Sequence, residues 1–314
     1  MAGGADSFTV APPLPAPSAM TQPSVFRTAE IEDPSNRWLI HPLSHRAARL
    51  FARLGWHPNA VSLLSLPFGL AAAAGLYHYG EPLAVTGGFL ALGVWHVLDG
   101  ADGQLARMTG KSSEAGKVID GVADYLVNIA VYLALAWALV PALGGAAWAW
   151  AVAAGLSHAF QGSLYEYYRY EYDYWGRGVA GRRVPEAAEL RAKMASTRGL
   201  TRLLHAFHYA YVRAQSLGAG PRPRLHRVLA GRVAEGPAAE DWRARYRVVN
   251  RPLVRRWAWL NANKRTLAVY LACLWATPLY YFLWELVILN GVMVACAWAQ
   301  RRADRRLLAE LGGG

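Results

Sequence analysis

The sequence has only two cysteines among its 314 residues, and residues 1–30 have neither a basic start nor an apolar core. Cys273 and Cys296 both lie in apolar stretches, where we expect small buried side chains rather than a disulfide or a metal site. The histidines lack the spacing of a zinc motif such as H-E-x-x-H. We expect no signal peptide in residues 1–30, and their Pro-, Ala- and Ser-rich composition predicts a disordered cytoplasmic segment.

Lysine and arginine are missing from three long stretches, 54–106, 118–168 and 266–300. The chain is 54% hydrophobic, contains 13 tryptophans and still has a formal net charge of +12. This combination indicates a membrane protein with basic flanks rather than a soluble nucleic-acid-binding protein. Because a membrane span needs about 20 apolar residues, each stretch has room for a helical hairpin. We predict six spans: 58–78, 83–105, 118–141, 145–167, 264–279 and 280–300.

The predicted turns around 78–82, 141–145 and 277–280 contain no lysine or arginine, so all the basic residues fall on the other side. Positive charge marks the cytoplasmic side of a membrane protein. We therefore expect both termini and the region 99–124 to face the cytoplasm, in the inner membrane of a bacterium given the Ala- and Arg-rich composition. The fifth span is the shortest because of Pro278, which leaves a tilted or re-entrant pair open.

The flanking segments are basic and amphipathic. Apolar and basic residues alternate through 31–54, which predicts an interfacial helix that meets a bilayer with anionic headgroups. Residues 169–265 contain 21 Lys or Arg and only seven Asp or Glu, with apolar residues at helical spacing. The predicted organisation is an all-α, six-transmembrane-helix bundle, divided into a disordered 1–30, an amphipathic helix with membrane helices 1–4 at 31–168, a basic cytoplasmic helical insert at 169–263, membrane helices 5–6 at 264–302 and a C-terminal tail at 303–314.

Four aspartates recur at fixed spacings near the ends of the second and third spans. Asp99 and Asp102 are three residues apart, and Asp120 and Asp124 are four apart, so each pair projects from one helix face. Four neighbouring carboxylates repel one another unless a cation neutralises them, and hard oxygen ligands select Mg²⁺, Mn²⁺ or Ca²⁺. We predict a metal site. His96, one turn before Asp99, is interpreted as a packing residue because hard cations prefer oxygen.

The segment from Asp99 to Asp124 is similar, at every fixed position, to the motif D-x2-D-G-x2-A-R-x8-G-x3-D-x3-D of the CDP-alcohol phosphatidyltransferase family. Upstream, Asn36-Arg37, His41-Pro42-Leu43, Gly55 and Pro58-Asn59-Ala60-Val61-Ser62 resemble the approach of that family to its first membrane helix more loosely. The resemblance covers residues 36–125, and the later helices match only in number.

The resemblance implies that a CDP-linked donor passes its substituted phosphate to an acceptor hydroxyl with release of CMP. It also implies two divalent ions, Mg²⁺ or Mn²⁺, and a homodimer. The expected metal ligands are Asp99, Asp102, Asp120 and Asp124, and Asp124 is also the expected catalytic base. The expected nucleotide and diphosphate contacts are Gly103, Ala106, Arg107, Gly116 and Asn59.

Further contacts to phosphate or acceptor are predicted at Lys111, Ser112, Ser113 and Arg169, although the first three suit an ordinary turn equally well. We favour CDP-diacylglycerol as donor and a polyol or polyol phosphate as acceptor, because a basic cytoplasmic face attracts an anionic acceptor. A CDP-amino alcohol with diacylglycerol or ceramide as acceptor remains open. More remote alternatives are an intramembrane prenyltransferase, whose acidic motifs lie far apart in sequence, and a non-catalytic transporter or lipid-binding protein.

Overall fold

The computed structural model describes residues 28–220, 222–233, 238–275 and 277–312. These residues form helices, and they contain no strand, which confirms the all-α prediction. The predicted disordered segment 1–30 lies almost entirely outside the described residues.

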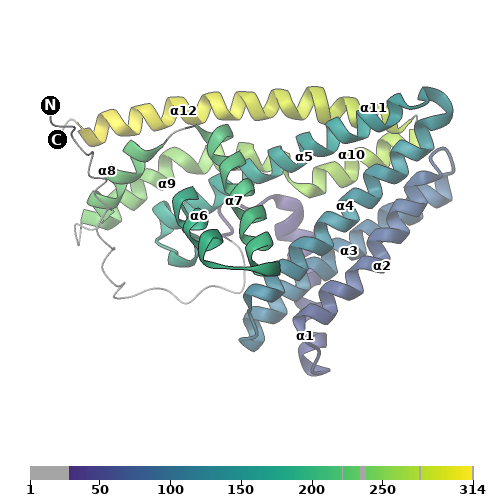
Figure 1. Ribbon diagram of the computed structural model, residues 1–314, viewed down its shortest axis with the longest axis horizontal. Helices are drawn as coiled ribbons and strands as arrows, with labels where there is room; N and C mark the ends of the chain where they lie inside the picture. Colours follow the sequence, from purple (N-terminus) through teal and green to yellow (C-terminus); the bar gives the residue numbers. More distant parts are fainter. Residues whose placement is uncertain (1–27, 221, 234–237, 276, 313–314) are drawn as a thin grey trace.

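The first half of the chain consists mainly of long helices (Figure 1). A π-helical turn, Asn36–Ile40, leads into α1 (His41–Arg53), followed by α2 (Pro58–Tyr77), α3 (Pro82–Thr109), α4 (Glu114–Leu143) and α5 (Ala146–Glu171). Pro58 and Pro82 stand in the first turn of their helices, where the missing N–H has no intrahelical partner to lose. α2 packs against both α3 and α4.

Small residues hold these helices close together. A Cβ added to Gly75 of α2 would lie 2.6 Å from the carbonyl oxygen of Ala84, and one added to Gly69 would lie 2.2 Å from Val127 of α4. A Cβ on Gly100 of α3 would lie 2.6 Å from the hydroxyl of Ser44 in α1. Close packing of this kind is typical of membrane helices, where small residues let backbones approach.

The basic connection folds into helices that pack onto the rest of the protein. Its elements are η2 (Tyr172–Gly176), η3 (Ala180–Arg182), α6 (Ala187–Ser196), α7 (Gly199–Ala219), α8 (Pro223–Val233), α9 (Ala238–Trp257) and η4 (Ala258–Leu260). Arg222, just before α8, donates hydrogen bonds to Glu171 at 2.9 Å and to Asp304 at 2.8 Å, and all three residues are buried. This ion-pair network joins α5, the connection and the C-terminal helix.

The C-terminal region consists of α10 (Ala262–Trp275), α11 (Pro278–Leu283), the π-helical η5 (Trp284–Leu289) and α12 (Asn290–Gly312). α12 runs along one edge of the molecule beside α9 (Figure 1). It remains helical through the predicted tail as far as Gly312.

Four helices in the described part of the chain are long and apolar enough to cross a membrane: Pro58–Tyr77, Pro82–Thr109, Val118–Leu143 and Pro278–Glu310. They indicate a multi-pass integral membrane protein. The prediction of six spans is not confirmed. α10 has 14 residues, which at about 1.5 Å per residue reach roughly 21 Å, less than the hydrocarbon core. α5, the predicted fourth span, has 26 residues, but it is too polar towards its C-terminal end to be one of the candidate membrane spans.

Helix α1 is amphipathic. Ser44 and Ala48 are buried against α3, whereas Leu50 and Leu54 remain exposed. The interfacial location predicted for this helix stays a prediction.

Candidate active site

A tight turn between α3 and α4 brings the two halves of the acidic motif together. α3 ends at Gly110, whose positive φ of 68° suits glycine, and the N–H of Lys111 bonds to the carbonyl of Ala106 at 3.0 Å. Ser113 then caps α4, because its hydroxyl accepts a hydrogen bond from the N–H of Gly116 at 2.9 Å. The chain thus reverses within a few residues, and α3 and α4 both pack against α2 with their aspartates facing one another.

Three of the four predicted aspartates converge. Asp99, Asp120 and Asp124 each present a carboxylate oxygen, and these three oxygens lie within 4.8 Å of one another. All three side chains are half-buried, and Oδ1 of Asp124 is buried without a hydrogen-bond partner in the described part of the chain. An all-oxygen donor set with an unpartnered buried oxygen suits a hard divalent cation such as Mg²⁺ or Mn²⁺.

Asp102 is held differently from the other three. Its side chain is only 4% exposed, and its Oδ2 accepts a hydrogen bond from the hydroxyl of Ser62 in α2. It still lies close enough to Asp99 and Asp120 to repel them electrostatically. Ser62 therefore fixes the position of this carboxylate, which is not among the three that converge.

The predicted nucleotide contacts fall into two groups beside the aspartates. On α3, the guanidinium of Arg107 lies over Gly103, where an added Cβ would be 3.4 Å from Nη1. At the starts of α2 and α4, Asn59 and Gly116 meet, and a Cβ on Gly116 would lie 3.1 Å from Oδ1 of Asn59. Ala106 is half-buried on α3. The aspartates therefore have the exposed guanidinium of Arg107 on one side. On the other side they have the side-chain amide of Asn59, next to Gly116.

A model of the family CDP-alcohol phosphatidyltransferase matches residues 56–195, which include all of these side chains. A search of curated proteins found no match. The family consists of transferases that generally use a divalent metal, and the matched residues 56–195 of this chain contain the acidic cluster.

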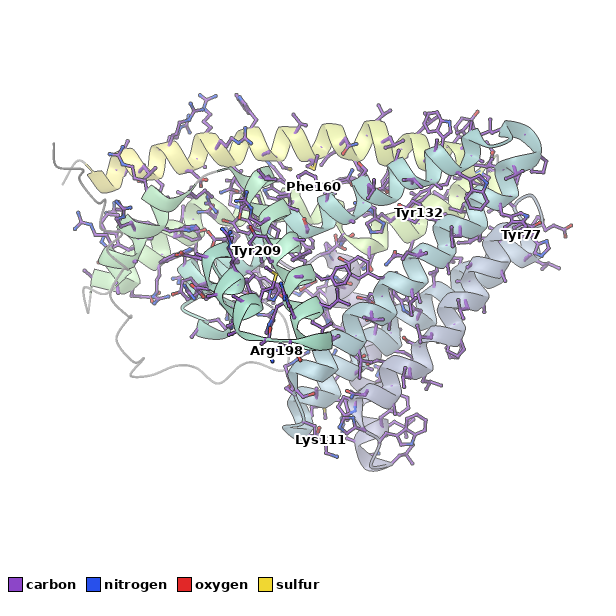
Figure 2. The ribbon with its side chains drawn as sticks, viewed as in Figure 1. Tyr77, Lys111, Tyr132, Phe160, Arg198 and Tyr209 are labelled. Atoms are coloured by element: carbon purple, nitrogen blue, oxygen red, sulfur yellow. The ribbon has the colours of Figure 1, made fainter. Side chains whose placement is uncertain are left out.

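The residues of the turn between α3 and α4 are mainly exposed. Lys111 lies at the tip of the α3–α4 hairpin (Figure 2), and Ser112 is exposed beside it. Ser113 is committed to the helix cap described above.

Arg169, at the end of α5, is only 4% exposed and donates a hydrogen bond to Glu166. Its guanidinium also lies 5.6 Å from the centre of the Tyr170 ring. Burial lowers the pKa of Arg169, but the carboxylate of Glu166 and the other acidic groups around it together outweigh that effect and hold the pKa above its ordinary value. Among the described residues, Arg169 contacts Glu166 and Tyr170 rather than the aspartates.

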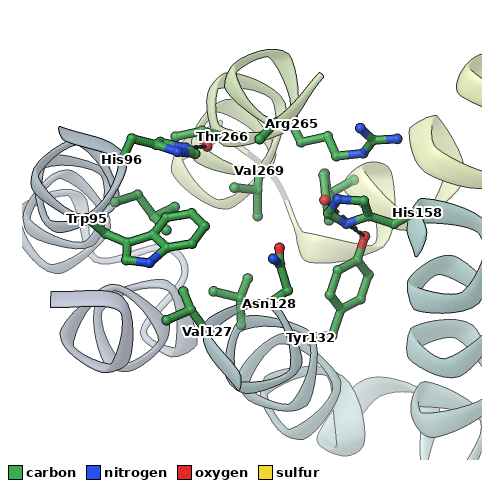
Figure 3. Close-up of a pocket in the computed structure, with 13 residues that line it drawn as sticks. Trp95, His96, Val127, Asn128, Tyr132, His158, Arg265, Thr266 and Val269 are labelled. Atoms are coloured by element: carbon green, nitrogen blue, oxygen red, sulfur yellow. Dashed lines mark hydrogen bonds between the residues drawn. The ribbon is translucent and has the colours of Figure 1, made fainter. Parts of the chain in front are cut away.

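A small cavity is lined by residues one helical turn away from the aspartates, among them His96 on α3 and Asn128 on α4 (Figure 3). It has a volume of about 30 Å³, enough for one or two water molecules. His96 contacts Thr266 at 2.8 Å, and Asn128 donates to the backbone carbonyl of Asp124 at 2.8 Å. The bond to Thr266 agrees with the interpretation of His96 as a packing residue.

Arg265 and His158 line the other side of this cavity, and sequence reasoning missed both. His158 is an isolated polar residue within an apolar stretch, which is a usable signal because such residues are costly in a membrane. Arg265 directly precedes the apolar stretch 266–300, as a basic residue that flanks a membrane helix would. Its position in the sequence therefore does not distinguish it as a cavity residue.

Proposed function

We propose that this protein is a CDP-alcohol phosphotransferase of phospholipid synthesis, which moves a substituted phosphate from a CDP-linked donor to an acceptor hydroxyl and releases CMP. The observation that carries the proposal is the convergence of Asp99, Asp120 and Asp124 within 4.8 Å, in a segment that the family model matches.

In this mechanism Asp99, Asp102, Asp120 and Asp124 hold two divalent ions, Mg²⁺ or Mn²⁺. When bound, such ions neutralise the diphosphate and stabilise the charge that develops on the leaving CMP. The exposed guanidinium of Arg107 forks onto the phosphate oxygens of the donor. Gly103 and Gly116 leave room for the diphosphate, while Asn59 and Ala106 border the nucleotide.

The transfer forms a bond between the acceptor oxygen and the phosphorus atom, and it breaks the bond from that phosphorus to the oxygen of CMP. CMP leaves with the electron pair of the broken bond. Asp124 takes the proton of the acceptor hydroxyl, a role that suits its buried Oδ1, which has no hydrogen-bond partner among the described residues.

We favour CDP-diacylglycerol as donor and a polyol or polyol phosphate as acceptor, because the basic residues around the site attract an anionic acceptor. Lys111, Ser112 and Arg169 are candidate acceptor or phosphate contacts, and Arg169 would have to exchange Glu166 for the ligand. We further propose a homodimer in a bacterial inner membrane, with the aspartates at its cytoplasmic side. A CDP-amino alcohol with a diacylglycerol or ceramide acceptor would use the same aspartates.

The test is CMP release by the purified protein with Mg²⁺ or Mn²⁺. CDP-diacylglycerol and CDP-choline are offered separately against polyols, polyol phosphates, diacylglycerol and ceramide, with EDTA as the metal-free control. Metal-dependent CMP from CDP-diacylglycerol and a polyol supports the favoured substrates, and CMP from CDP-choline with a lipid hydroxyl supports the alternative. A folded protein that releases no CMP in any combination contradicts the proposal.

A further inference from the structure

A groove of about 510 Å³ lies between α9 and the C-terminal half of α12, outside the residues that the family model matches. Its apolar floor includes Val249, Leu253 and Leu307, of which the two leucines are buried. The volume falls within the roughly 300–1,000 Å³ typical of small-molecule sites. Figure 1 shows the two helices side by side along one edge of the molecule.

Three arginines line the mouth of this groove. Arg256 comes from α9, and Arg302 and Arg306 come from successive turns of α12. All three are exposed, and within the described residues none forms an ion pair or a side-chain hydrogen bond. One carboxylate, that of Glu310, also lines the groove. Positive charge therefore exceeds negative charge here, and the geometry offers several donors to one anion.

The position of the groove along α12 matches the level of lipid headgroups. Residues 266–300 contain no lysine or arginine, and Arg301 and Arg302 follow directly. Trp298 lines the groove at this boundary and is 60% exposed. The centre of its ring lies 5.6 Å from the guanidinium carbon of Arg302. Tryptophan favours membrane interfaces because its ring is apolar and its N–H is polar.

We propose that this groove binds an anionic phospholipid. Arg256, Arg302 and Arg306 hold the phosphate group, and the first carbons of an acyl chain lie against the exposed ring of Trp298, on the side of the apolar run 266–300. The excess of positive charge selects an anionic over a zwitterionic lipid. Because the groove is formed by both α9 and α12, the bound lipid also fastens the basic connection to the C-terminal helix. This proposal does not rest on the enzymatic activity.

The experiment compares phosphatidylglycerol with phosphatidylcholine as ligands of the purified full-length protein in a non-ionic detergent. Lipid retention is measured by native mass spectrometry and lipid-induced stabilisation by thermal unfolding. The test variant is Arg302→Gln with Arg306→Gln. The matched control is Arg301→Gln with Arg305→Gln, which removes the same charge from adjacent positions of the same helix that do not line the groove.

We expect phosphatidylglycerol, but not phosphatidylcholine, to remain bound and to raise the Tm of the wild type. The groove variant should bind phosphatidylglycerol roughly thirty-fold more weakly, because each arginine contributes about a factor of five to interfacial anion binding. The control variant should keep the preference. Should the double groove variant fail to fold, Arg256→Gln on α9 provides the same comparison.

Equal retention of the two lipids, or an equal loss in the groove and control variants, would overturn the proposal. Glycerol 3-phosphate serves as the soluble arm, and stabilisation by it at the same concentration would show a free-phosphate site instead of a lipid site. A change of oligomeric state confined to the groove variant without lipid would show an interface between two copies of the chain, which would also overturn the proposal.

Discussion

The buried ion pair between Arg265 and Glu285 leads to a sharp prediction about stability. Arg265 of α10 donates to both carboxylate oxygens of Glu285, at 3.1 and 3.3 Å, and to the backbone carbonyl of Asn261 at 3.3 Å. It also donates to the side chain of Gln161 in α5. The side chains of Arg265 and Glu285 are 4% and 0% exposed. This pair therefore ties α10, η5 and α5 together away from solvent.

Arg265→Met removes the guanidinium and leaves the carboxylate of Glu285 buried without its partner. Breaking one side of a buried pair costs about 3–5 kcal/mol, which at about 2 °C per kcal/mol corresponds to a Tm lowered by roughly 6–10 °C. Arg265→Met with Glu285→Met should recover most of that loss, because an apolar pair of similar volume leaves no unpaired charge.

The matched control is the exposed pair of Arg183 and Glu189, whose side chains are 46% and 38% exposed. Arg183→Met should cost less than about 1 kcal/mol, because solvent screens an exposed pair. The assay is thermal unfolding of all four proteins in the same detergent, followed by tryptophan fluorescence. If Arg265→Met lowers the Tm no more than Arg183→Met, or if the double variant is as unstable as the single, the reasoning is refuted.

Three further predictions concern the site and the basic connection. Ser113→Ala removes the cap of α4 and should cost about 1 kcal/mol, measured as a Tm lowered by about 2 °C. Gly116→Ala places a methyl group 3.1 Å from both Oδ1 of Asn59 and Oγ of Ser113 and should lower kcat/KM for the donor roughly 10- to 100-fold without lowering the Tm, because alanine favours a helix more than glycine does; wild-type kinetics would contradict this. Burial alone would raise the pKa of the Glu171 carboxyl, but His226 and Arg222 hold it below the ordinary 4.5, so Glu171 stabilises the fold above that pH and its contribution is lost as the pH falls through the lowered pKa. The Tm gap between wild type and Glu171→Gln should therefore be larger at pH 7 than at pH 4, and a constant gap would argue against it.

The first three membrane helices followed closely from the sequence because their ends carry local signals. The predicted spans 58–78, 83–105 and 118–141 correspond to Pro58–Tyr77, Pro82–Thr109 and Glu114–Leu143. Proline at a helix start and a glycine at positive φ after α3 mark these boundaries. The sequence also predicts that aspartates of α3 and α4 converge, because a short turn between two helices restricts how their faces can meet.

The partners of the buried charges could not be predicted, because each lies far away in the sequence. Arg222 pairs with Glu171 and Asp304, which are 51 and 82 residues away. From the pattern of charge alone, Arg222 is one of many basic residues in a predicted cytoplasmic insert. Arg169 forms a hydrogen bond with Glu166 of the same helix, and the contact with phosphate that the sequence predicts for it stays a prediction.

The prediction of six membrane spans is not confirmed, for a related reason. A run without lysine or arginine shows where a membrane helix is permitted, but it does not require one. α5 carries its polar residues inward, where Gln161 donates to the backbone carbonyl of Glu285 at 3.2 Å and to the side chain of Asn290 at 2.9 Å. These contacts depend on the packing of the C-terminal helices, which single-sequence hydropathy does not contain.

The most direct test of the central claim is CMP release as a function of Mg²⁺ concentration, measured for the wild type and for Asp124→Asn with the CDP-linked donor that the wild type accepts. The wild type should show saturable, EDTA-sensitive release. Asp124→Asn should fold, bind CDP in the presence of metal and turn over about 10²- to 10⁴-fold more slowly, as expected for loss of a general base. Release by the wild type that persists in EDTA, or unchanged turnover by the variant, would contradict the account.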